Sequence, residues 1–278
     1  MTESGKVALV TGAGGGLGGA MSLALAQAGH KVAAVDADAA ALERFMARAQ
    51  EADVASRIRP FVCDLGDAAE CLALPKRVIA DFGGLYMIVN NAGVGMQLID
   101  PDYSTAQAAP FWETDISGWQ KIMDVNVRAP MILAQQGAKH FVSQGRGRIV
   151  NVTTSFDTMI APKVWAYGQA KAALEAASAS LAAQLASTPV TMNILVPGGP
   201  ANTGLLPANT DLPRDKILQP PVMGPPIVWL ASDDADGFNN RRIVARMWDG
   251  TMPGREAAAK ASAPSAWPGF GMQAAQPK

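Results

Sequence analysis

The sequence is poor in the residues from which metal centres and disulfide frameworks are built. Its 278 residues include two cysteines, Cys63 and Cys71, and two histidines, His30 and His140. The cysteines do not form a C-x-x-C pair, and neither histidine has further ligands at a metal-binding spacing. We therefore predict reduced thiols and no bound metal, with one disulfide as the open alternative.

Charge and long hydrophobic runs are also scarce. Charged residues make up 17% of the chain, its net charge is −1, and its basic residues are scattered. This argues against nucleic acid or an anionic membrane as a partner. No apolar run reaches the roughly 18 residues that cross a bilayer, and residues 1–10 do not resemble a signal peptide. We expect a cytoplasmic protein.

What is present is an alternation of strand-like and helix-like segments. Hydrophobic residues make up 49% of the chain, and no linker divides it. Strands that alternate with helices of about a dozen residues predict βαβ units and a parallel sheet. We predict one α/β domain over residues 1–250. An Ala/Pro/Gly-rich tail over residues 251–278 is expected either to dock through Trp267 and Phe270 or to be disordered.

A glycine cluster follows the first predicted strand, where residues 11–19 read T-G-A-G-G-G-L-G-G. Glycine permits the tight turn and lets a dinucleotide pyrophosphate approach the backbone at the positive end of the next helix. The spacing fits both G-x-G-x-x-G and T-G-x-x-x-G-x-G. The cofactor-binding candidates in this turn are Thr11, Gly12, Gly14, Gly16, Leu17 and Gly18.

Asp36 ends the second predicted strand, 24 positions after Gly12. A carboxylate at this place can accept hydrogen bonds from the adenosine ribose hydroxyls, and it would repel a 2′-phosphate. Residues 13–15 and 37 supply no arginine or lysine to bind that phosphate. The sequence therefore favours NAD over NADP. Alternatively, Asp36 caps the following helix, a role that Asp38 could fill instead.

Tyr167 and Lys171 stand four residues apart in an alanine-rich run. A helix stacks residues at this spacing on one face, so the ammonium would lie beside the phenol. A nearby cation favours the phenolate and lowers the phenol pKa from about 10 toward neutral pH, which would make Tyr167 a usable acid or base. The plainer alternative is a helix with a half-buried tyrosine and a solvated lysine.

Two hydroxyl side chains, Thr154 and Ser155, precede Tyr167 by thirteen and twelve residues. They follow residues 148–152, which we predict to be a buried strand, so they lie at its carboxyl end, where open α/β sheets bind ligands. Adjacent strand residues face opposite sides, so only one of the two can face the site if the strand continues that far.

Taken in order over about residues 5–250, these motifs resemble the short-chain dehydrogenase/reductase family. The resemblance implies a Rossmann-like, doubly wound α/β domain with a seven-stranded parallel sheet flanked by helices. It also implies hydride transfer between NAD(H) and a secondary alcohol or ketone, by a homo-oligomer (dimer or tetramer). The further positions that match the family's motifs are Asp64, Asn90, Ala92, Gly93, Asn126, Pro197, Gly198 and Thr203.

The resemblance also implies roles for the site residues. Tyr167 would be the general acid/base, Lys171 would lower its pKa and hold the nicotinamide ribose, and Asn126 would hold a water that relays protons. A hydroxyl would orient the substrate oxygen; the family's usual spacing favours Thr154, although that position is usually serine, and Ser155 is the rival. The other matched positions would contact the cofactor, and the loops at residues 94–115 and 198–226 would contact the substrate.

Two other functions are compatible with the same motifs. One is a nucleotide-binding or redox-sensing protein without catalysis, against which the retained tyrosine, lysine and hydroxyl argue. The other is a lyase or epimerase that cycles NAD without releasing it, against which the lack of a larger C-terminal substrate domain argues.

Overall fold

Eight strands form one sheet in the computed structural model, which describes residues 5–105, 107–207, 210 and 212–267. Their order is β3-β2-β1-β4-β5-β6-β7-β8. The strands are β1 (Val7–Thr11), β2 (Lys31–Asp36), β3 (Ile58–Val62), β4 (Met87–Asn90), β5 (Gly147–Val152), β6 (Val190–Val196), β7 (Arg241–Val244) and β8 (Ser262–Pro264). The first seven are parallel, as predicted, and β8 pairs antiparallel with β7.

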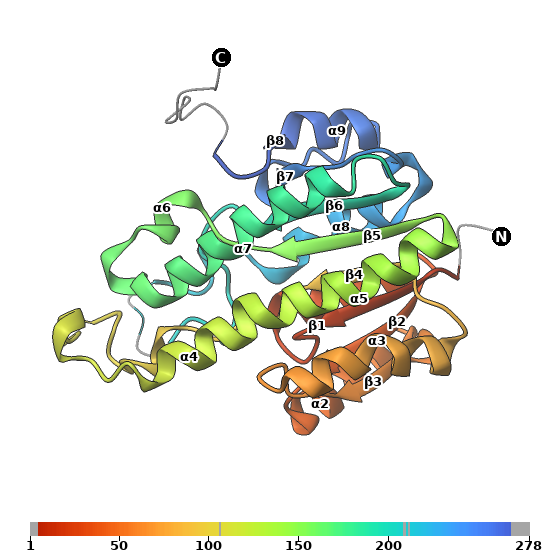
Figure 1. Ribbon diagram of the computed structural model, residues 1–278. Helices are drawn as coiled ribbons and strands as arrows, with labels where there is room; N and C mark the ends of the chain where they lie inside the picture. Colours follow the sequence, from red (N-terminus) through yellow and green to blue (C-terminus); the bar gives the residue numbers. More distant parts are fainter. Residues whose placement is uncertain (1–4, 106, 208–209, 211, 268–278) are drawn as a thin grey trace, which may run out of the picture.

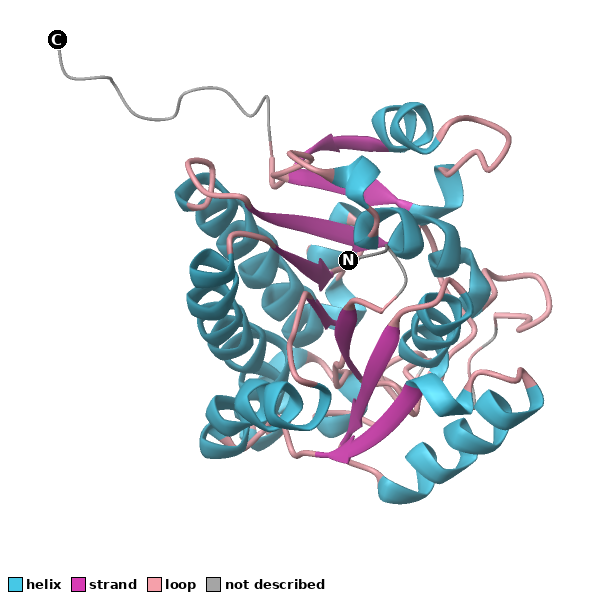
Figure 2. Ribbon diagram, turned by 90° about the vertical axis from the view of Figure 1, so that its right-hand side faces the viewer, coloured by secondary structure: helices cyan, strands magenta, loops and turns pink. Residues whose placement is uncertain are grey.

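Helices cover both faces of this sheet, as Figure 2 shows from the side. The α-helices are α1 (Gly16–Gln27), α2 (Ala39–Glu51), α3 (Ala68–Phe82), α4 (Ser117–Met123), α5 (Ala129–Gln144), α6 (Phe156–Met159), α7 (Trp165–Gln184), α8 (Gly224–Ala231) and α9 (Gly254–Ala261). One hydrophobic core lies under α1, α2 and α8, and a second lies under α3, α5 and α7. Because both faces are covered, β1, β4, β5 and β6 are buried throughout their length.

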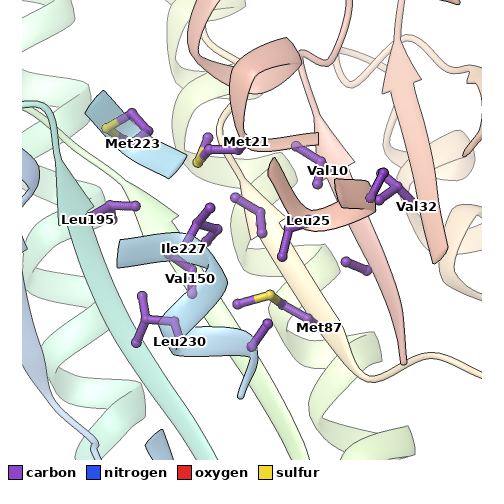
Figure 3. Packing of buried hydrophobic residues seen from close by; sticks show 14 of the residues in the cluster. Val10, Met21, Leu25, Val32, Met87, Val150, Leu195, Met223, Ile227 and Leu230 are labelled. Carbon is purple, nitrogen blue, oxygen red and sulfur yellow. The ribbon is translucent and has the colours of Figure 1, made fainter. Parts of the chain in front are cut away.

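The packing of α1 against α8 fixes the helix that follows the glycine turn. Met21 and Leu25 of α1 are fully buried and share a core cluster with Ile227 and Leu230 of α8. Figure 3 shows these side chains meeting above the β-sheet residues of the same cluster. The amino end of α1 is thereby held at the carboxyl edge of the sheet.

The strand order reverses direction between β1 and β4. From β1 the chain first builds β2 and β3 on one side, and then β4 to β7 on the other (Figure 1). Connections leave such a point in opposite directions, so a crevice opens at the carboxyl ends of the strands. The glycine turn and the end of β5 both lie at this edge.

Residues 117–144 do not form one continuous α-helix. A π-helical turn, Asp124–Arg128, separates α4 from α5, and Pro130 lies in the first turn of α5. Proline is accepted there because the first amides of a helix have no partner within it. Asn126 is fully buried within the π-helical turn. Such turns commonly occur at functional sites.

The domain boundary predicted at residue 250 is wrong. Residues 254–264 form α9 and β8, which extend the fold, and Trp267 packs 6.0 Å from Phe156 between ring centroids. Alanine-rich composition suggests a tail, but here the small side chains allow close packing, since Ala257, Ala258 and Ala261 are buried. Phe270 lies outside the described residues.

Both outer strands of the sheet contain a proline within their pairing. In β3, Pro60 is in register with Ala34 of β2, and in β8, Pro264 is in register with Arg241 of β7. Proline has no amide hydrogen to donate and is tolerated in sheets mainly at their edges.

The two cysteines are free and buried, so the disulfide alternative is not found. Burial raises the thiol pKa of Cys63 to about 12 and that of Cys71 to about 11. Among the described residues, no group of His, Cys, Asp and Glu side chains could hold a metal ion. In the same part of the chain, no helix has the length and hydropathy needed to span a bilayer.

Candidate active site

One cavity of about 750 Å³ brings together nearly all of the predicted site residues. It opens at the carboxyl edge of the sheet, with the glycine turn contributing to its wall together with the ends of β2, β4, β5 and β6 and the start of α7. The predicted residues that do not line it are Thr11, Gly14, Asn90 and Asn126.

The glycine turn leaves no room for a side chain at Gly12, Gly16 or Gly18. Gly12 has a φ of +68°, and a Cβ on Gly18 would lie 2.1 Å from the Gly12 carbonyl oxygen. A Cβ on Gly16 would lie 2.8 Å from Thr203 Cγ2. Gly15 is the N-cap residue of α1, a twelve-residue helix, and no side chain accepts a hydrogen bond from the first amides of that helix. The first residues of α1, Gly16, Leu17 and Gly18, line the cavity. This arrangement fits a pyrophosphate.

Thr11 stabilises the turn from below instead of lining the cavity. Its hydroxyl donates to the Val89 carbonyl at 3.3 Å and accepts from the amides of Asn91 and Ala92 at 3.0 Å each. These bonds join the carboxyl ends of β1 and β4, between which the chain reverses direction. The Thr11 side chain therefore has a structural role, and its contact with a cofactor stays a prediction. Gly14 likewise serves as an amide donor to Asp36.

Asn90 is also placed in the sheet and not in the cavity. Its amide nitrogen donates to Asn151 Oδ1 at 2.8 Å, between neighbouring positions of β4 and β5. Asn91, which the sequence analysis did not select, lines the cavity and donates to the Thr11 carbonyl at 2.9 Å. Asn90 is the last residue of β4, whereas Asn91 lies just beyond the strand. This explains why Asn91, and not Asn90, lines the cavity.

Asp36 stands at the end of β2 with its carboxylate fixed by backbone amides. Gly14 N donates to Oδ2 at 3.0 Å and Asp38 N donates to Oδ1 at 3.1 Å. Asp38, and not Asp36, caps α2 by accepting from Ala41 N at 3.1 Å. The capping alternative for Asp36 is therefore wrong. Its carboxylate lines the cavity and keeps lone pairs for ribose hydroxyls.

Asp64 forms an ion pair that the sequence analysis missed. Lys121 Nζ lies 3.0 Å from each of its carboxylate oxygens, and Gly66 N donates to Oδ1 at 2.7 Å. The Gly66 hydrogen bond and then Lys121 hold the pKa of the Asp64 carboxyl below its ordinary value. Lys121 comes from α4 and lines the same cavity. No local motif connects residues so far apart in the chain.

Lys171 is buried beneath the cavity, with 3% of its surface exposed. Its ammonium donates to the Val152 carbonyl at 2.9 Å and lies 5.8 Å from the centroid of the Tyr167 ring. Burial lowers the pKa of Lys171 to about 8. The predicted stacking of the two side chains is confirmed, and the plain alternative of a solvated lysine is wrong.

The pKa of Tyr167 changes in the direction opposite to the one expected from sequence. Burial, and then the neighbouring Tyr103, raise it above its ordinary value of 10.0. Tyr103 belongs to the loop at residues 94–115 and lines the same cavity. The spacing of Tyr167 and Lys171 indicates proximity, but it carries no information on how far each side chain is removed from water.

Thr154 and Ser155 both line the cavity but differ in their partners. Ser155 caps α6: its hydroxyl oxygen accepts from Thr158 N at 3.2 Å and lies 2.7 Å from Thr158 Oγ1. The Thr154 hydroxyl has no hydrogen-bond partner among the described residues. The local structure therefore commits Ser155 to the helix start and leaves Thr154 available to a ligand.

Asn126 holds the backbone of the loop at residues 94–115. Its Oδ1 accepts from Val94 N at 2.9 Å, and its Nδ2 donates to Val94 O at 2.8 Å. Each amide atom bonds to residue 94 once and keeps a further lone pair or hydrogen, so the expectation that the side chain holds a water stays a prediction. A Cβ on Gly93 would lie 3.2 Å from Asn126 Oδ1 and 3.5 Å from Lys171 Nζ, which places Asn126 close to Lys171.

The loop at residues 198–226 is fastened by an arginine that the sequence analysis did not select. Arg214 donates to Asn202 Oδ1 and to the carbonyl oxygens of Thr203, Leu206 and Pro207, at 2.9 to 3.2 Å. Residues 208–209 and 211 lie outside the described chain. These bonds hold the loop over the cavity, into which it places apolar side chains at Leu205, Leu206 and Leu212.

Comparison with known proteins places this arrangement among its relatives. A family model described as short chain dehydrogenase matches residues 6–211. D-threitol dehydrogenase from Mycolicibacterium smegmatis is 31% identical over 252 residues, which cover 86% of this chain and 91% of that protein.

Two solved structures share the fold and were obtained with different cofactors. The 3-ketoacyl-(acyl-carrier-protein) reductase from Brucella melitensis, complexed with NADH, is 25% identical with a TM-score of 0.70, over 84% of this chain and 93% of that one. A metagenomic short-chain oxidoreductase in complex with NADP is 24% identical with a TM-score of 0.67, over 82% and 91%.

Proposed function

The chain belongs to the short-chain dehydrogenase family, and from this premise we propose that it transfers a hydride between NAD(H) and a secondary alcohol or ketone. The observation that carries the proposal is the single cavity shared by the glycine turn, Asp36, Thr154, Tyr167 and Lys171. It is tested by incubating the purified protein with NADH and a panel of ketones, and with NAD and the matching alcohols. Turnover supports the proposal.

Two outcomes of this panel would favour the rival functions. If neither direction shows turnover, the protein is a nucleotide-binding or sensing protein without catalysis. If the purified protein carries a dinucleotide through gel filtration and consumes a substrate without exchanging it, the lyase or epimerase alternative is favoured. Absorption spectra of the purified protein distinguish the second outcome.

The residues of the cavity divide the reaction between them. A bound nicotinamide supplies or accepts the hydride. During ketone reduction Tyr167 donates its proton to the substrate oxygen, and during alcohol oxidation its phenolate accepts the proton. The ammonium of Lys171, held by the Val152 carbonyl, stabilises the phenolate that forms. Thr154 donates a hydrogen bond to the substrate oxygen and so orients it.

Replacing the two hydroxyls separately tests their assignment. Thr154→Val is expected to lower kcat/KM by about 10²-fold, since it keeps the side-chain shape but removes the donor to the substrate oxygen. Ser155→Ala removes the cap of α6 and is expected to cost about 1 kcal/mol of stability with a smaller kinetic loss. Steady-state kinetics and thermal melts of both variants measure this. A larger kinetic loss in Ser155→Ala would reverse the assignment.

We propose NAD as the cofactor because of Asp36. Its carboxylate would accept hydrogen bonds from two ribose hydroxyls and would repel a 2′-phosphate. The neighbouring structures were obtained with NADH or NADP, which supports a nicotinamide dinucleotide in general.

Asp36→Ala is expected to lower the ratio of NAD to NADP activity by about 100-fold, because it removes both the ribose acceptor and a like-charge repulsion of several kcal/mol. Measuring kcat/KM for both cofactors gives this ratio. Asp38→Ala is the matched control, since it removes a nearby carboxylate that caps α2 and does not line the cavity. It should leave the ratio unchanged. A wild-type preference for NADP would refute the assignment before any mutation.

The substrate is proposed to be a small or medium secondary alcohol or ketone. The cavity wall near Tyr167 combines Tyr103 and Met96 with the leucines of the loop at residues 198–226, which suits a carbon skeleton with few charges. The relative named D-threitol dehydrogenase makes short polyols the first compounds to test. We further propose a homo-oligomer, dimer or tetramer, which light scattering of the purified protein would measure.

A further inference from the structure

A buried ion pair lies next to the active site and has no part in the proposed reaction. Glu175, on α7 one turn beyond Lys171, is fully buried, and Arg242 on β7 is 7% exposed. Arg242 Nε lies 3.2 Å from Glu175 Oε1. Removing two charges from water is costly, so such a pair persists only when further partners satisfy it.

Those partners belong to the segment that carries the catalytic hydroxyl. Thr153 Oγ1 donates to Glu175 Oε2 at 2.7 Å, and Arg242 donates through Nη2 to the Thr154 carbonyl. The guanidinium also lies 4.3 Å from the centroid of the Phe156 ring. The ion pair therefore contacts the backbone or side chain of three residues from the end of β5 to the first residue of α6.

The end of the described chain contacts the same pair. Ala266 N donates to Glu175 Oε1 at 3.2 Å, directly after β8, and Trp267 packs against Phe156. Pairing of β5 with β6 ends at Val152. Beyond that point the hydroxyl-bearing segment leaves the sheet, so its position depends on contacts of this kind.

We infer that Glu175 and Arg242 are positioning residues, which hold the backbone of Thr153 and Thr154 so that the Thr154 hydroxyl meets the substrate oxygen. Residues 262–267 complete this support from the C-terminal side. The kinetic part of this inference rests on the proposed function, whereas its structural part does not.

The structural part is measured by amide hydrogen exchange of peptides covering residues 152–160. In Arg242→Met, exchange is expected to quicken by at least about tenfold there, because the Thr154 carbonyl loses its donor and Glu175 loses its counter-charge. Arg59→Met is the control: it also removes an ion-paired arginine from a strand, but its partner is Asp81 and its strand, β3, lies at the opposite edge of the sheet. Equal exchange in wild type and Arg242→Met would overturn the inference, whether or not the protein has turnover.

The kinetic part is measured in the same variants with the ketone that the wild type reduces. Arg242→Met is expected to lower kcat by about 10²-fold, the effect of a misplacement of about 1 Å, with the Kd for NADH changed by less than about threefold. Arg242→Lys should recover part of kcat, because an ammonium keeps the charge but not the forked donor. Loss of NADH affinity in proportion to kcat would indicate general disruption and would contradict the inference.

A double-mutant cycle separates positioning from an independent effect. In a Thr154→Val background the hydroxyl is already absent, so Arg242→Met should lower kcat by less than about threefold further. A full additional loss of about 10²-fold would show that Arg242 acts elsewhere. If Arg242→Met does not fold, Glu175→Gln serves in its place, since the glutamine oxygen still accepts one hydrogen bond while the counter-charge of Arg242 is removed.

Discussion

Turnover is expected to be abolished in Tyr167→Phe, with kcat lower by at least about 10³-fold and the Kd for NADH within about threefold of wild type. The substitution removes one hydroxyl and keeps the ring that lines the cavity. That hydroxyl has no hydrogen-bond partner among the described residues, so the melting temperature should change by less than about 3 °C. Steady-state kinetics, NADH fluorescence titration and a thermal melt measure the three quantities.

A second tyrosine provides the control for this experiment. Tyr86 is buried, with the guanidinium of Arg148 centred 5.4 Å from its ring centroid, and it does not line the cavity. Tyr86→Phe should therefore keep wild-type kcat. Retained turnover in Tyr167→Phe would remove Tyr167 from the mechanism, and lost turnover in both variants would point to a general effect of losing a tyrosine hydroxyl.

Lys171→Met is expected to remove turnover, by about 10³-fold, and to change how stability depends on pH. The pKa of Lys171 is about 8 in the folded protein and near 10.5 in the unfolded chain. Between these values the unfolded chain binds more protons, so the contribution of Lys171 makes the free energy of unfolding rise with pH. Below pH 8 the full cost of burying the ammonium is present.

The size of this effect is measured by urea unfolding at about pH 7 and about pH 9.5. The wild type should gain about 2 kcal/mol from Lys171 across this interval, and the variant should lack that part of the change. Lys139→Met, which alters an exposed lysine of α5, is the control and should keep the wild-type slope. An unchanged slope in Lys171→Met would show that Lys171 keeps an ordinary pKa. The raised pKa of Tyr167 acts in the opposite direction, but only above about pH 10.

Features that depend on short stretches of backbone were predictable from the sequence. The glycine turn, the carboxylate at the end of β2 and the Tyr167–Lys171 pair are each defined within a few residues, and strand, turn and helix geometry then determines where they point. The parallel orientation of the strands followed from the alternation of segments, and the number seven from the family resemblance. For these features, the positions predicted from short sequence motifs match those in the structure.

Interactions between distant residues were not predictable in the same way. The Lys121–Asp64 pair joins residues 57 positions apart, and the contact of Arg242 with Thr154 joins residues 88 apart. A single sequence shows that both residues are present, but it does not show that they are in contact in the folded protein. The same limit explains why the pKa of Tyr167 is raised although the sequence predicts a lowered pKa. The shift depends on the burial of the side chain, and that burial depends on loops distant in the sequence.

Composition alone also misled at the C-terminus. Alanine, glycine and proline are common in chains that do not fold, yet in α9 three of the four alanines face the core and the strand that follows completes the sheet. Small side chains are compatible with disorder and with close packing, and only the partner surface distinguishes the two.

The prolines of the two outer strands bear on how copies of the chain can associate. Exposed strand edges act as templates for further strands, and a missing amide donor interrupts that template. With Pro60 in β3 and Pro264 in β8, both sides of the sheet are interrupted in this way. Assembly should therefore proceed through helices or loops and not through a sheet continuous between molecules, which also disfavours fibrous aggregation during folding.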